Sequence, residues 1–89
     1  MIAEHVRELV ERFVAGLDEL GASVAAPPRG PLVCVRSTDA PALVSALAKE
    51  DIVASERDSN LRVALHLYNT ADDVDAVLAA LARHRGFLR

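Results

Sequence analysis

The residue best suited to chemistry is Arg62, which stands in the middle of a regularly alternating stretch. Residues 61–68 carry a large apolar side chain at every second position, which is typical of a strand with one buried face. Arg62 falls between these positions and therefore points away from the core. An arginine fixed on a rigid strand can hold a carboxylate through two parallel hydrogen bonds. Arg57, in the polar turn 56–60, is a weaker candidate for the same role. On the pattern alone, a solvated strand face is the simpler interpretation of Arg62.

The other residue types that carry chemistry form no catalytic or metal-binding motif. His5, His66 and His84 fall in separate elements and have no metal-ligand spacing with Cys34. Cys34 lies in the apolar run 32–35, where a free cysteine behaves as a small core hydrophobe. The glycines are scattered, so no phosphate-binding loop is present, and no serine stands in a nucleophile motif. The sequence therefore predicts no catalytic residue, no metal ligand and no cofactor-binding residue in this chain.

A small α+β domain, spanning residues 1–89, must position Arg62. Apolar residues at helical spacing predict helices over residues 2–20, about 41–49 and about 71–85. Short apolar runs predict strands over residues 22–26, 32–35, 52–54 and 61–68, and the continuous run 32–35 is expected to be buried on both faces. The order is therefore α-β-β-α-β-β-α. Hairpin-like connections then predict a small antiparallel-type sheet with helices mainly on one face.

Two charged clusters are explained by the ends of the last helix. Thr70 and Asp73 have the spacing of a capping box, with Asp in place of the usual Glu or Gln. Arg83, His84 and Arg85 stand at the opposite end, where the helix dipole favours positive charge. We therefore interpret both clusters as structural.

One face of the predicted sheet has little to cover it. It carries Arg62, Ala64, His66 and Tyr68 together with alternate residues of 32–35. Exposed apolar area of this kind is typical of a partner surface. The alternative is that the long first helix covers this face within the domain.

Composition excludes several classes of function. The chain has 89 residues and a net charge of −3, so electrostatics give it no reason to bind nucleic acid or an anionic membrane. No apolar run approaches the length of a membrane span, and Met1 opens onto an amphipathic pattern unlike a signal peptide. With Cys34 as the single cysteine, no internal disulfide can form, and we expect a cytoplasmic protein.

The sequence resembles the C-terminal small domain of class V aminotransferase-fold enzymes. The resemblance rests on residues 60–75, which follow the pattern LR-x-x-x-H-x-YNT-x-x-DVD, and extends to residues 30–33 and 51–53. This pyridoxal-phosphate (PLP) family contains cysteine desulfurases, selenocysteine lyases, isopenicillin N epimerases and kynureninases. The likeness covers nearly the whole chain but only about the last quarter of such an enzyme.

The resemblance implies a role for Arg62 and implies that a large PLP-binding domain is needed beside this chain. The matching arginine of the family binds the α-carboxylate of the amino-acid substrate, at the cleft between the small domain and a large PLP-binding domain. The family's cofactor is held as a Schiff base by a lysine of the large domain. The only lysine here is Lys49, at the end of a predicted surface helix and in no such motif. The chain alone is therefore expected to be inactive, and PLP is implied only for an intact parent enzyme, expected to be a homodimer.

One difference from the family reduces the number of reactions that the resemblance suggests. Many cysteine desulfurases carry a persulfide-forming cysteine in the loop before the arginine strand, and residues 55–60 contain none. The aminotransferase, epimerase and lyase branches therefore fit better. A separate hypothesis is a stand-alone, non-catalytic ferredoxin-like module that self-associates through its open sheet face or binds a small ligand.

Overall fold

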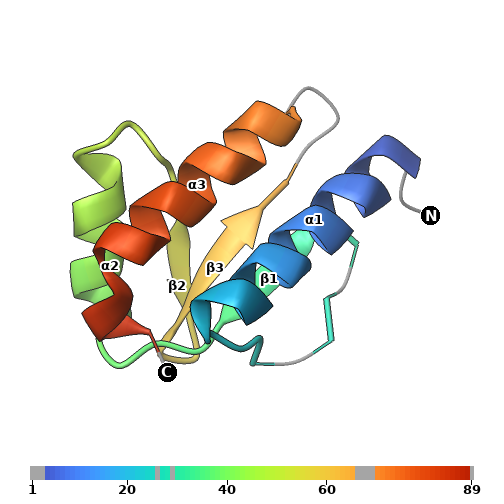
Figure 1. The fold of residues 1–89 in the computed structure, drawn as a ribbon. Coiled ribbons are helices and arrows are strands. Elements are labelled where there is room, and N and C mark those ends of the chain that lie inside the picture. Colours follow the sequence, from blue (N-terminus) through green and yellow to red (C-terminus); the bar gives the residue numbers. More distant parts are fainter. Residues whose placement is uncertain (1–3, 26, 29, 66–69, 89) are drawn as a thin grey trace.

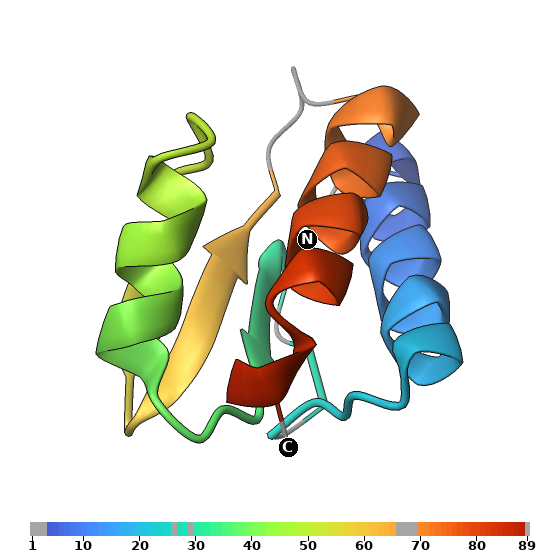
Figure 2. The ribbon, with the colours of Figure 1, turned by 60° about the vertical axis from the view of Figure 1, so that its left-hand side comes forward.

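The computed structural model describes residues 4–25, 27–28, 30–65 and 70–88 as one α+β unit. The elements are α1 (Glu4–Leu20), β1 (Leu32–Val35), α2 (Ala40–Ala48), β2 (Ser55–Arg57), β3 (Asn60–Ala64), α3 (Ala71–Arg83) and the 3₁₀ turn η1 (Arg85–Phe87). The strands form an antiparallel sheet in the order β1-β3-β2, so β3 is central. The helices gather over one face of this sheet (Figures 1 and 2). The fold class predicted from the sequence is confirmed.

The core lies between that face of the sheet and the three helices. The alternation predicted for residues 61–65 is confirmed: Leu61, Val63 and Leu65 are buried, whereas Arg62 is half-buried and Ala64 exposed. The largest side chains that are fully buried are Phe13, Leu17, Leu43, Leu47, Leu61, Leu81, Val33, Val35 and Val74. They come from all three helices and from β1 and β3. Each helix therefore contributes its apolar stripe to a single core.

Two of the four predicted strands are wrong, so the described residues form a sheet of three strands. Within residues 22–25, Val24 makes only an isolated bridge to Val35, because Pro27 and Pro28 follow closely and cannot extend a ladder. Residues 52–54 form no strand. The pairing instead begins at residue 55, inside the segment that the sequence suggested was a turn.

The turn between β2 and β3 explains why the pairing shifted. It consists of Asp58 and Ser59, with φ values of 52° and 68°. Two consecutive residues at positive φ make a tight hairpin turn, and such a turn fixes the register of its two strands. Arg57 therefore pairs with Asn60 and Ser55 with Arg62. Local turn geometry thus outweighed the apolar character of residues 52–54.

Strand β1 is buried on one face, and the prediction of two buried faces is wrong. Val33 and Val35 are fully buried, whereas Cys34 is half-buried and Leu32 is 38% exposed. The helices cover only the face that carries the two valines. Cys34 is consequently a residue of the open face and not of the core.

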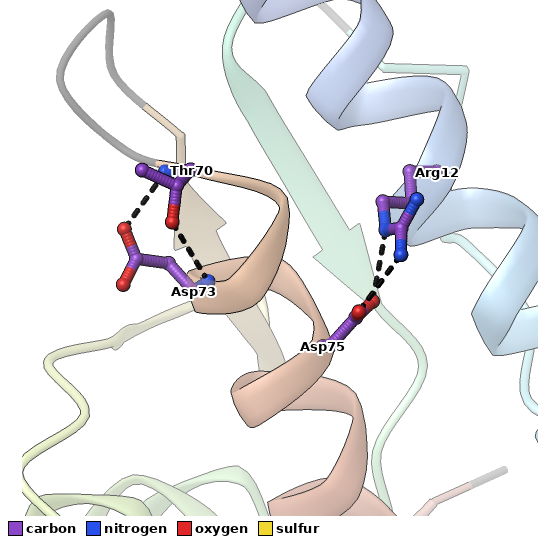
Figure 3. A network of polar contacts seen from close by, with 4 residues as sticks. All are labelled: Arg12, Thr70, Asp73 and Asp75. Atoms are coloured by element: carbon purple, nitrogen blue, oxygen red, sulfur yellow. Dashed lines mark hydrogen bonds and ion pairs between the residues drawn. The ribbon is translucent and has the colours of Figure 1, made fainter.

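The capping box predicted at the start of α3 is confirmed. The Thr70 hydroxyl accepts a hydrogen bond from the Asp73 backbone N–H at 3.3 Å, and the Asp73 carboxylate accepts one from the Thr70 N–H at 2.8 Å (Figure 3). Two residues after Asp73, Asp75 accepts two hydrogen bonds from the guanidinium of Arg12, at 2.9 and 2.8 Å. This fork joins α1 to α3 on the surface.

A buried serine joins the end of β1 to β3. The Ser37 hydroxyl donates to the Val35 carbonyl at 2.9 Å and accepts from the Leu61 N–H at 3.1 Å. The Ser37 N–H in turn donates to Asn60 Oδ1 at 3.2 Å. The hydroxyl thus continues the β1–β3 hydrogen bonding beyond the last paired residue and helps to hold the strand that carries Arg62.

Replacement of Ser37 by alanine should destabilise the domain. Ser37→Ala leaves the buried N–H of Leu61 without its partner, which should lower the free energy of unfolding by about 1–3 kcal/mol. Urea denaturation measures this change. Ser45→Ala, at an exposed position of α2, is the matched control and should change stability by less than about 0.5 kcal/mol. Equal stability of the two variants would contradict the role of Ser37.

Candidate functional site

Arg62 lies at the centre of a row of three side chains that crosses the open face of the sheet. In the strand pairing, Arg62 lies opposite Cys34 on β1 and opposite Ser55 on β2. Directly opposed residues of antiparallel strands share a face, so a thiol, a guanidinium and a hydroxyl stand side by side. The two neighbours of Arg62 along β3, Leu61 and Val63, are 0% and 3% exposed on the helix side. The prediction that Arg62 faces away from the core is therefore confirmed.

Ser55 holds the guanidinium of Arg62 through one of its five N–H groups. Arg62 Nε donates to Ser55 Oγ at 3.0 Å, in a partly buried position. Within the described ranges, no carboxylate forms an ion pair with Arg62. The terminal nitrogens Nη1 and Nη2 therefore retain their hydrogen-bonding capacity. A half-buried cation with spare donors is suited to binding an anion.

Arg57 shares this face but lies in a more open environment. It is the last residue of β2, where the sequence suggested a turn. Its side chain is 64% exposed, and its Nε lies 4.0 Å from Asp58 Oδ2. An exposed pair at this separation contributes little. The structure thus brings the two predicted arginines to one face and gives only Arg62 a fixed position.

A cleft of about 490 Å³ runs along the edge of β3 next to Arg62. Its walls are residues 50–55, residues 62–65 and one side of α3 at Asp73, Ala76 and Val77. The cleft arises because β2 is short: the pairing with β3 ends at Arg62, and residues 52–54 form no strand there. The lining is mostly apolar, with Arg62 as its one cation among these residues.

A carboxylate at the rim of the cleft is paired with the end of α3. Glu50 accepts a hydrogen bond from Arg83 Nη2, and Glu50 Oε2 lies 3.0 Å from His84 Nε2. The hydrogen bond from Arg83, followed by that from His84, lowers the pKa of Glu50. The sequence suggested that Arg83 and His84 serve only the helix end. A contact over more than thirty residues leaves no local sequence signal, so the pair could not be predicted.

The other predicted residues lie apart from this site. Lys49 is exposed at the C-cap of α2, and His5 is exposed on α1. His66 and Tyr68 lie outside the described residues. No group of three metal-ligating side chains occurs among the residues that the structure describes, and no helix there is long and apolar enough to cross a membrane. An exposed lysine at a helix end does not suit a Schiff-base site, so the chain's own residues do not fit PLP.

Comparison with known proteins relates this fold to part of larger enzymes. No protein-family model and no curated protein matches the chain. Among solved structures, a cysteine desulfurase from Thermococcus onnurineus matches 97% of the chain with a TM-score of 0.86 and 19% identity. An 8-amino-7-oxononanoate synthase from Francisella tularensis and an aminotransferase from Anaerococcus prevotii each match 92% of it, with a TM-score of 0.78 and 18% identity.

The chain has the fold of one part of each of these three enzymes. It spans 26% of the cysteine desulfurase, 27% of the synthase and 20% of the aminotransferase. The three enzymes differ in the reaction that their names describe. The likeness therefore establishes the architecture on which Arg62 stands.

Two of the carboxylates in ion pairs, Glu50 and Asp75, predict how stability depends on pH. Hydrogen bonds from Arg83 and His84 lower the pKa of Glu50, and the hydrogen bond from Arg12 lowers the pKa of Asp75. A lowered folded-state pKa gives stability that is complete above the unfolded-state pKa of about 4 and is lost as pH falls through the folded-state value.

The free energy of unfolding should therefore fall as the solution is acidified below about pH 4. Urea denaturation across a pH series measures this dependence. Glu50→Gln and Asp75→Asn should each make it shallower, because the amide cannot titrate. Glu11→Gln, exposed on α1 and outside both pairs, is the control. The same pH dependence in all three variants would rule out a contribution from these pairs.

Proposed function

We propose that this chain acts as the small domain of a PLP-dependent enzyme and that Arg62 binds the carboxylate of an amino-acid substrate. The observation that carries the proposal is the state of Arg62. It is half-buried, held on the central strand by Ser55, and has no carboxylate partner in the described part of the chain. Because no carboxylate of the described residues pairs with this half-buried arginine, we favour an external carboxylate as its partner.

Arg62 contributes binding and orientation in this proposal. A guanidinium offers two parallel N–H groups to the two oxygens of a carboxylate, so it fixes direction as well as position. The rigid strand limits how far the bound group can move, and orientation of this kind lowers the barrier for a reaction at a neighbouring atom. PLP supplies the electron sink of such enzymes when it is bound. Because the residues of this chain do not fit the cofactor, it would be held by another domain.

The sequence of the β2–β3 hairpin favours some reactions over others. Residues 55–60 contain no cysteine, and Cys34 stands on β1, at the opposite edge of the sheet from β2. We therefore favour the aminotransferase, epimerase and lyase branches of class V over persulfide-forming desulfuration. In the intact enzyme, the reaction would be proton abstraction and group transfer or elimination at the α- or β-carbon of an amino acid.

A second candidate function is self-association through the open sheet face. The observation that favours it is exposed apolar surface on that face, where Leu32 of β1 is 38% exposed. An apolar surface of this kind also suits docking to a cofactor-binding domain. The two candidates differ in whether the covering surface belongs to a second copy or to a different domain.

Reaction of Cys34 provides a test of carboxylate binding on the chain itself. Cys34 is directly opposite Arg62, with Cβ atoms about 5 Å apart in such pairs. Iodoacetate carries a carboxylate and iodoacetamide does not, so the ratio of their alkylation rates cancels differences in thiol accessibility. Arg62→Ala should lower this ratio by roughly fivefold, equivalent to about 1 kcal/mol, the attraction of two unit charges about 4 Å apart in water. Mass spectrometry of the alkylated protein measures both rates.

Two further variants separate specific binding from general charge. Arg57→Ala makes the same change in net charge on the same face and should alter the ratio less. Arg62→Lys keeps the charge without the planar fork and should give an intermediate ratio. A ratio unaffected by Arg62→Ala would refute the role of Arg62, and a larger fall in Arg57→Ala would assign the role to Arg57.

The native mass of the protein tests the proposal of a missing domain. An antibody raised against this chain, used on extracts of the source cells, should detect a species several-fold larger than 89 residues or a stable complex with a PLP-binding protein. A free species of the size of this chain would contradict the small-domain proposal. Sedimentation over a range of concentrations would then reveal whether that species self-associates.

A further inference from the structure

We propose that Ser55 is a positioning residue that makes Arg62 bind its carboxylate end-on, through Nη1 and Nη2. This inference rests on the proposed function, because it concerns how the same arginine meets the same chemical class of ligand. Its basis is the 3.0 Å hydrogen bond from Arg62 Nε to Ser55 Oγ. The bond occupies the one N–H that a side-on carboxylate would need.

A second arginine in the molecule provides the comparison. Arg12 binds Asp75 side-on, with Nε donating at 2.9 Å and Nη2 donating at 2.8 Å (Figure 3). In Arg62 the Nε–H is already donated to Ser55. The two terminal nitrogens are then the remaining pair of parallel donors, and they lie at the tip of the side chain. The ligand is therefore held beyond the tip and away from β2.

The backbone fixes the Ser55 hydroxyl in this position. Ser55 is the first residue of β2 and directly opposes Arg62. The register is set by the two-residue turn at Asp58 and Ser59. β3 is fixed on its other side by pairing with β1 and by the Ser37 hydrogen bonds. The hydroxyl and the guanidinium thus stand on two strands that cannot shift in register relative to each other.

The hydrogen bond also lowers the conformational entropy that the Arg62 side chain loses when a ligand binds. An unrestrained arginine samples many rotamers, and ordering a long side chain at binding weakens affinity. With Nε held by Ser55, most of this ordering occurs before the ligand arrives. Ser55 thus acts through Arg62 and does not need to contact the ligand.

Nuclear magnetic resonance of the arginine side chains in the 89-residue chain tests the inference. Acetate is the probe, titrated at constant ionic strength with chloride as the control anion. In the wild type, the Nε–H of Arg62 should exchange slowly with water, and acetate should shift the Nη signals more than the Nε signal. Ser55→Ala should speed the exchange of the Nε–H, let acetate shift Nε, and weaken acetate binding roughly two- to tenfold.

Ser55→Thr and Ser45→Ala complete the design. Threonine keeps the hydroxyl and suits a strand, so Ser55→Thr should retain the slow exchange and the wild-type affinity. Ser45→Ala, on the exposed side of α2, should resemble the wild type. Backbone spectra show whether each variant is folded, so a loss of affinity in a folded Ser55→Ala protein cannot be ascribed to unfolding.

The possible failures are distinguishable. If acetate leaves Arg62 of the wild type unaffected, the proposed function fails and the role of Ser55 fails with it. If acetate shifts Arg62 equally in the wild type and in Ser55→Ala, with the same affinity, the inference is overturned while carboxylate binding by Arg62 stands. A wild-type shift at Nε as large as at Nη would likewise overturn the end-on geometry.

Discussion

The pairing of β3 with strands on both sides is the constraint on which the rest of the molecule depends. Because β3 is central, its register with β1 and β2 decides the direction of every side chain along it. A shift by one residue would bring Arg62 into the apolar core and expose Leu61 and Val63. Burial of those two side chains therefore fixes the arginine on the open face. The same packing that stabilises the fold thus sets the chemistry of the opposite face.

The helices can cover only one face of so small a sheet. All three contribute to a single core on that side, tied together at the surface by the Arg12–Asp75 fork and the contact of Glu50 with Arg83 and His84. The sheet's other face carries the row Cys34, Arg62 and Ser55. In the solved enzymes with this fold, the matching region is 20–27% of the chain.

The sequence was sufficient where a pattern is local and repeated. Alternation placed Leu61, Val63 and Arg62 correctly, and the Thr70–Asp73 spacing predicted the capping box. The sequence was insufficient where the strand pairing or a side-chain contact depends on residues far apart in the chain or on the conformation of a single turn. Apolar content at residues 52–54 suggested a strand, but the Asp58–Ser59 turn set the pairing further along. The hydrogen bond between Arg62 and Ser55 exists because this register places the two residues opposite each other. The sequence pattern indicated a strand at residues 52–54 instead, so this bond could not be predicted from it.

The cost of desolvation connects the open face to the proposed function. An arginine in water forms only weak pairs with carboxylates, because solvent screens the charges and hydrates both groups. The same pair becomes stronger when a neighbouring surface excludes water, provided that the donors are already aligned. Ser55 supplies the alignment within this chain, and in the proposed function a second domain would supply the covering surface. In the proposed function, Arg62 would bind a carboxylate between this domain and a second one.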